Sequence, residues 1–117
     1  MHELALARGI LAATERHAEG RRVRRIEVSV GALRQVVPSS LAFNIEILAR
    51  GSICEGARLE QRLIPARLRC ACGMEWELVE LSFRCPRCGG TETAVTEGEE
   101  LRVEAIEVEE DRCTAAR

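Results

Sequence analysis

Residues 69–90 read RCACGMEWELVELSFRCPRCGG and contain two closely spaced pairs of cysteines. The first pair is Cys70 and Cys72, and the second pair, Cys85 and Cys88, follows after twelve intervening residues. Four thiolates can surround one zinc ion tetrahedrally, and their arrangement as two chelating pairs reduces the entropy lost in gathering them. The spacing therefore predicts a zinc module with a structural role, because four sulfur ligands leave no open coordination position.

The first pair is Cys-x-Cys, in contrast to the Cys-x-x-Cys of the second pair. In an extended backbone, residues i and i+2 point to one face, so the sulfurs of Cys70 and Cys72 can still reach one ion. Cys54 is an alternative first ligand in place of Cys70, although the long intervening segment disfavours it. Disulfides are a further alternative, which a chain without a recognisable secretory signal disfavours. The arginines expected to offset the thiolate charge are Arg69, Arg84 and Arg87.

The sequence on either side of this module predicts an α+β unit. Apolar periodicity indicates one helix over residues 4–18 and a second over residues 38–50, with a serine of the Pro38-Ser39-Ser40 segment as its N-cap. Alternating apolar residues indicate three strands, near residues 26–30, 59–63 and 101–106. A further strand around Trp76 lies between the cysteine pairs. We expect two helices packed on a three-stranded sheet, with a zinc-ribbon-like four-cysteine module inserted before the last strand.

Composition restricts the classes of partner. The chain has 117 residues, 17 basic and 19 acidic, with a formal net charge of −2. Nucleic-acid binding normally requires a surplus of Lys and Arg, so this balance disfavours nucleic acid as a partner. No run of about 18 apolar residues predicts a membrane span. We expect a protein of the cytoplasm that has no membrane partner.

The N-terminal residues Met1-His2-Glu3 form a second candidate metal site. The terminal amine, nearby backbone amides once deprotonated, and the His2 imidazole provide a run of nitrogen donors that can lie in one plane. Planar nitrogen sets favour Ni(II) or Cu(II), whereas zinc prefers the tetrahedral thiolate site. A histidine at position two also occurs by chance at ordinary solvated termini, so the pattern gains weight only in combination with the cysteine module.

These features together resemble the HypA/HybF family of nickel-incorporation proteins for hydrogenase, some of which also serve urease. The resemblance rests on Met1-His2-Glu3, the Val30-Gly31 strand end, the Pro-Ser-Ser-Leu-Ala-Phe segment at 38–43 and the cysteine pairs, and it extends to about Glu109. It implies a non-enzymatic metallochaperone that binds nickel through His2, with backbone nitrogens near Met1 and with Glu3. It also implies a nickel-binding domain of residues 1–66 plus 98–110 and a zinc-binding domain of residues 67–97.

The same resemblance implies partners: a nickel-handling GTPase of hydrogenase maturation and the precursor of a hydrogenase large subunit, with a homodimer also open. Two departures from the family pattern bear on the sites. The family usually has Cys-x-x-Cys as its first pair, and some members have an acidic residue before the second helix, where this chain has Ser39 and Ser40. The alternative function is a zinc-ribbon interaction module that binds nucleic acid or protein. A metal-dependent hydrolase is disfavoured, because such an enzyme needs an open metal position beside a base.

Overall fold

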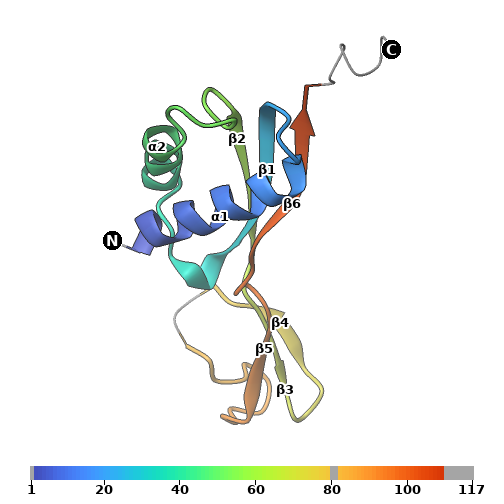
Figure 1. The fold of residues 1–117 in the computed structure, drawn as a ribbon. Helices are drawn as coiled ribbons and strands as arrows, with labels where there is room; N and C mark the ends of the chain where they lie inside the picture. The colour runs from blue at the N-terminus through green and yellow to red at the C-terminus, as the bar shows by residue number, and fades with distance from the viewer. Residues whose placement is uncertain (1, 80–81, 110–117) are drawn as a thin grey trace. The chain divides into compact units, whose positions relative to one another are not determined.

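The computed structural model describes residues 2–79 and 82–109, which form an α+β fold (Figure 1). It confirms the predicted α+β class, with two helices, a three-stranded sheet and a four-cysteine module, and the predicted strand around Trp76 is present. The module contains a second three-stranded sheet. The elements in chain order are α1 (His2–Ala18), β1 (Val23–Gly31), the 3-10 turn η1 (Ala32–Arg34), α2 (Pro38–Leu48), β2 (Arg58–Ile64), β3 (Arg67–Cys70), β4 (Glu75–Glu77), β5 (Thr93–Glu97) and β6 (Leu101–Val108).

Contacts within the chain divide it into two compact units. The first unit comprises Met1–Val28, Val36–Arg62 and Arg102–Arg117, and the second comprises Ser29–Gln35 and Leu63–Leu101. One sheet has the strand order β2-β1-β6 and lies mostly in the first unit, together with α1 and α2. The other sheet has the order β4-β3-β5 and lies wholly in the second unit.

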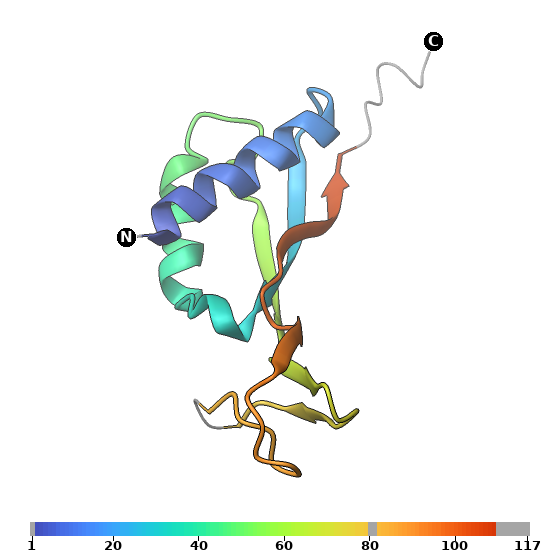
Figure 2. The ribbon, with the colours of Figure 1, turned by 90° about the horizontal axis from the view of Figure 1, so that it is seen from below.

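The first unit is held together by an aliphatic core. Helix α1 packs against α2, and both helices lie on one face of the β2-β1-β6 sheet (Figure 2). Ile26 and Val28 of β1 are fully buried beneath them, as the strand alternation predicts. The other described residues of this unit that are buried and apolar are Ala7, Ile10, Leu11, Ala18, Val23, Leu41, Ile45, Ala49 and Cys54.

The start of α2 differs from the prediction. Its N-cap is Val37, whose side chain makes no capping hydrogen bond, and Pro38 occupies the first helical position. The predicted serine N-cap is therefore wrong, since Ser39 and Ser40 lie inside the helix. Proline favours the first helical position because its fixed φ suits the helix and its missing N–H would have no intrahelical partner there. Val37 thus becomes the cap position despite its apolar side chain.

The second unit is built on the central strand β3, which pairs antiparallel with β4 and with β5. Leu68 of β3 is 1% exposed and faces Trp76 on one neighbour and Val95 on the other. Strands β3 and β5 were not predicted. The described residues of this unit that are buried and apolar are Val30, Ala66, Leu68, Cys70 and Cys85.

The length and hydropathy of the helices bear on whether one of them could cross a membrane. Within the described ranges, no helix has the length and apolar character needed to cross a membrane. Helix α1 has 17 residues and alternates buried residues with exposed charged ones, as expected for a helix that covers a core.

Candidate metal centres

The β3–β4 hairpin positions the first cysteine pair. Cys70 is the last residue of β3, and its N–H donates to the Met74 carbonyl at 2.8 Å. The Gly73 N–H donates back to the Cys70 carbonyl at 2.8 Å, which closes a tight turn with Cys72 inside it. Gly73 has a φ of +98°, a conformation that a side chain would strain. The two sulfurs therefore converge through a turn, and the extended geometry predicted for Cys-x-Cys is wrong.

The second pair lies in a turn whose amides point at sulfur. The N–H groups of Arg87 and Cys88 both donate to Cys85 Sγ at 3.4 Å, and the Gly90 N–H donates to Cys88 Sγ at 3.3 Å. Backbone N–H groups directed at a sulfur stabilise the thiolate, which is the form that binds metals. This turn is therefore arranged to hold two metal-binding sulfurs.

The two turns bring four sulfur atoms together. The ligand atoms of Cys70, Cys72, Cys85 and Cys88 all lie within 4.8 Å of one another. Cys70 Sγ lies 3.6 Å from Cys88 Sγ, and Cys72 Sγ lies 3.7 Å from Cys85 Sγ. A tetrahedron with zinc–sulfur bonds of about 2.3 Å has sulfur–sulfur edges of about 3.8 Å. Both the spacing and the donor set fit a four-thiolate zinc site.

The charges around this cluster make its thiols unequal. The Met74 backbone N–H and then the Arg87 guanidinium lower the pKa of Cys72 to about 6. For Cys70, the backbone amide of Cys72 also favours the thiolate. Burial and the hydrogen bonds with the other three thiols outweigh it and raise the pKa of Cys70 to about 12. A metal ion that binds all four sulfurs must displace the protons that these thiols still carry.

Among the contacts of the described residues, only one of the three arginines expected to offset the thiolate charge reaches a sulfur atom. Arg87 Nη2 donates to the Cys72 carbonyl at 2.8 Å and lies 3.6 Å from Cys72 Sγ. Arg84 Nη1 instead donates to the Gly89 carbonyl at 3.0 Å. Arg69 forms an ion pair with Glu75 at 3.8 Å. Charge compensation at the cluster is therefore centred on Arg87.

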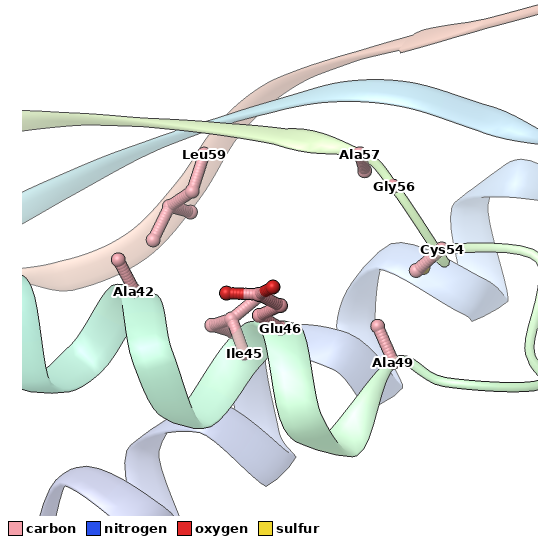
Figure 3. A pocket seen from close by; sticks show the side chains of 8 residues that line it. All are labelled: Ala42, Ile45, Glu46, Ala49, Cys54, Gly56, Ala57 and Leu59. Atoms are coloured by element: carbon pink, nitrogen blue, oxygen red, sulfur yellow. The ribbon is translucent and has the colours of Figure 1, made fainter.

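Cys54 is not part of the four-sulfur cluster. It lies in the loop between α2 and β2 in the first unit, is 1% exposed, and has its thiol pKa raised mainly by burial. It lines a pocket of about 300 Å³ beside α2, which the sequence did not predict (Figure 3). The other lining residues are Ala42, Ile45, Glu46, Ala49, Gly56, Ala57 and Leu59. The structure thus gives Cys54 the environment of a core residue.

The predicted N-terminal site is described from its second residue onward, because Met1 lies outside the described residues. His2 begins α1 and its side chain is 53% exposed, so the imidazole can reach a metal ion from solvent. Glu3 is only 7% exposed, and its Oε2 accepts a hydrogen bond from the Val37 N–H at 3.2 Å. That bond is the first cause of a lowered pKa at Glu3, and His2 Nε2 lies 3.9 Å from the same oxygen.

Comparison with known proteins places these two centres in context. A family model described as "Hydrogenase/urease nickel incorporation, metallochaperone, hypA" matches residues 1–108. A Geobacter metallireducens protein named hydrogenase maturation factor HypA is 38% identical over 110 residues, which cover 93% of this chain and 100% of that protein. A protein of the same name from a Nostoc species is 40% identical over 111 residues, which cover 94% of this chain and 97% of that protein.

Solved structures show the same fold. The solution structure of the nickel metallochaperone HypA from Helicobacter pylori matches with a TM-score of 0.69 and 24% sequence identity. The match covers 92% of this chain and 97% of that protein.

Proposed function

The chain belongs to the HypA family of nickel-incorporation metallochaperones, and from this premise we propose that it binds Ni(II) at its N-terminus and delivers it during maturation of nickel enzymes such as nickel–iron hydrogenase. Members of this family are metallochaperones and maturation factors, not enzymes. The nickel ion is therefore cargo, and the protein must both hold it and release it.

Zinc in the cysteine cluster would have a structural role. Cys70, Cys72, Cys85 and Cys88 would hold it, and the sulfur–sulfur distances of 3.6 and 3.7 Å support this assignment. Bound zinc would supply a closed tetrahedral crosslink between the two turns. With all four positions filled by sulfur, the cluster would have no place for a substrate or for nickel in transit.

Nickel would be held by Met1, His2 and Glu3, with Glu3 contributing its backbone nitrogen. The first four N–H groups of an α-helix have no intrahelical acceptor, and α1 begins at His2. Coordination by deprotonated amide nitrogens at this point therefore breaks no main-chain hydrogen bond of the helix. The exposed His2 imidazole completes a set of nitrogen donors, which suits Ni(II) better than zinc.

Release would follow from the openness of this site. A ligand on a partner can approach from solvent and displace the donors one at a time, beginning with the exposed imidazole of His2. Protons compete with nickel for the amine and imidazole nitrogens, so nickel would be held less tightly as the pH falls. The cysteine cluster, in contrast, offers no such stepwise exchange at an open position.

The remaining parts of the proposal concern partners and organisation. We propose that the partners of this chain are a nickel-handling GTPase and a hydrogenase large-subunit precursor, and that nickel is transferred in the cytoplasm. Neither nucleic acid nor a membrane would be a partner. A homodimer is compatible with this role. We also propose that residues 1–66 plus 98–110 form the nickel-binding domain and residues 67–97 the zinc-binding domain.

The observation that carries the nickel proposal is the exposed His2 imidazole at the first turn of α1. The test is nickel titration of the zinc-loaded protein by calorimetry and absorbance, comparing wild type with His2→Ala. The control is His17→Ala, which removes the other histidine from the exposed end of the same helix. We expect His2→Ala to weaken nickel binding by more than about a hundredfold, because a first-sphere donor is lost.

Two results would contradict the proposal. If His2→Ala and His17→Ala both bind nickel as wild type does, the N-terminus is not the site. If the wild type itself shows no nickel binding, the chain is better explained as a zinc-ribbon interaction module for nucleic acid or protein. A nucleic-acid binding assay over a range of salt concentrations would then test that alternative.

A further inference from the structure

The start of α2 lacks a cap of its own. In a capping box, the side chain of the N-cap residue bonds to the N3 amide, and a Glu or Gln at N3 accepts from the N-cap amide. Here the N-cap is Val37, which has no polar side chain, and the N3 position is Ser40. Neither of the two usual side chains is therefore present in α2 itself.

A carboxylate from the other helix replaces one of them. Glu3 Oε2 accepts a hydrogen bond from the Val37 N–H at 3.2 Å, across 34 positions of sequence. This is the bond that a glutamate at N3 would make to the N-cap amide. The carboxylate also lies at the N-terminal end of α2, where the helix dipole favours negative charge. With only 7% exposure, the Glu3 side chain is fixed where α1 packs on α2.

We infer that Glu3 is a positioning residue, whose side chain caps α2 from α1 and thereby fixes the first turn of α1, from which His2 reaches nickel. This inference rests on the proposed nickel function. It assigns separate roles to two neighbouring residues: His2 donates to the metal, and the Glu3 carboxylate anchors the backbone that presents it.

The alternative is that the Glu3 carboxylate coordinates nickel directly. Its Oε2 is already an acceptor for Val37 and lies 3.9 Å from His2 Nε2. A carboxylate has about four lone-pair sites, so it could accept from Val37 and still bind a metal ion. As a ligand, however, it would supply an anionic oxygen that neither Ala nor the neutral amide of Gln provides. Positioning and coordination therefore predict different responses to substitution.

Three variants of the zinc-loaded full chain separate these roles. Glu3→Ala removes the acceptor, Glu3→Asp keeps the charge but shortens its reach, and Glu3→Gln keeps an oxygen acceptor at the same reach. Glu15→Ala is the matched control, since Glu15 is an exposed glutamate on the same helix. The readouts are hydrogen exchange at the Val37 amide, the nickel dissociation constant and the absorbance spectrum of the nickel-saturated protein.

We expect the Val37 amide to exchange about tenfold faster in Glu3→Ala and in Glu3→Asp, because a cap hydrogen bond is lost. Nickel binding should weaken about tenfold in both variants, as is typical for the loss of a group that orients a ligand. Glu3→Gln should recover most of both effects, and Glu15→Ala should show neither. The nickel absorbance spectrum should keep its shape in every variant, because the set of donors is unchanged.

Several outcomes would overturn the inference. An altered spectrum and an equal loss of nickel in Glu3→Ala and Glu3→Gln would show that the carboxylate is a ligand, whatever the exchange at Val37. Faster exchange with unaltered nickel affinity would show a cap without a positioning role. A wild-type protein that binds no nickel would overturn both the proposed function and the positioning role. Exchange at Val37 would then decide separately whether Glu3 caps α2.

Discussion

At the cysteine cluster, four sulfurs from two turns converge within 4.8 Å, and backbone amides and Arg87 already point at them. At the start of α1, a single exposed imidazole lies beside a buried carboxylate that serves another helix. The first arrangement would enclose a metal ion on all sides, and the second would leave one open to solvent. The difference teaches that retention and release of a metal can be assigned to separate places in one short chain.

The two units that contain these centres also differ in the size of their apolar cores. The first unit has a core of aliphatic residues from two helices and a sheet. In the second unit, two of the five described buried apolar residues are the proposed zinc ligands Cys70 and Cys85. A small module with so little apolar core usually depends on its metal for folding. We therefore expect zinc to stabilise the second unit, whereas the first unit folds without metal.

The largest expected effect tests this dependence on zinc. Cys85→Ser removes a buried ligand and the acceptor of two backbone amides. We expect the chain to lose zinc and the β4-β3-β5 sheet to lose its protection from hydrogen exchange, because metal binding and folding of such modules are coupled. Amides of α1 and β1 should remain protected. Measurement of bound zinc and residue-resolved exchange would check both expectations.

The matched control is Cys54→Ala, which removes a buried thiol outside the cluster. It should leave one zinc ion bound and the second sheet protected. Loss of zinc from this control, or retention of a folded second sheet in Cys85→Ser, would contradict the proposed dependence on the four-cysteine cluster.

A smaller effect is expected from a substitution that creates a cavity in the core of the first unit. Leu41 of α2 is fully buried, so Leu41→Ala should lower the free energy of unfolding of that unit by about 3 kcal/mol. Zinc binding should be retained, since Leu41 belongs to the first unit and the four cysteines belong to the second. Thermal or urea unfolding with a zinc assay would measure both. Ile47→Ala, at a position 39% exposed on the same helix, is the control and should have a much weaker effect.

The smallest expected effect concerns protons at the cluster. Arg87 helps to hold the pKa of Cys72 low, toward about 6, so its removal should raise that pKa and let protons compete better with zinc. In Arg87→Met, the pH at which zinc is lost on acidification should therefore move upward, by less than about one unit for so exposed a contact. A chromogenic chelator assay across pH would measure the shift. Arg69→Met is the control, because Arg69 pairs with Glu75; an equal shift there would disprove a specific role for Arg87.

Much of the fold could be predicted from residues that are close in sequence. The helices and the three longer strands follow from apolar periodicity, which reports the face buried by each element. Strand β3 spans only Arg67–Cys70, so its alternation of arginines with the buried Leu68 and Cys70 is too short to stand out from chance. Its pairing with β4 and β5 depends on the turns that gather the cysteines, and those turns leave no periodic signal.

The candidate metal centres could likewise be predicted only in part. The cysteine cluster could be predicted because each chelating pair is local and its chemistry is specific to metals. The turn that joins Cys70 to Cys72 could not, since the same spacing is compatible with an extended strand. The hydrogen bond between Glu3 and Val37 could not be predicted either, because it joins residues 34 positions apart and replaces a serine cap that the local sequence favours.

Gly31 and Gly98 of the second unit impose a steric limit on which residues these two positions can accept. A methyl group on Gly31 would overlap the Gly98 carbonyl, and one on Gly98 would lie 2.6 Å from the Ala66 Cα atom. The chain is joined there by the bonds from the Gly31 N–H to the Glu100 carbonyl and from the Leu33 N–H to the Gly98 carbonyl. Every missense change at either glycine codon adds at least that methyl group. In a deep mutational scan, both codons should tolerate no substitution, although neither glycine contributes a ligand, a charge or a side chain.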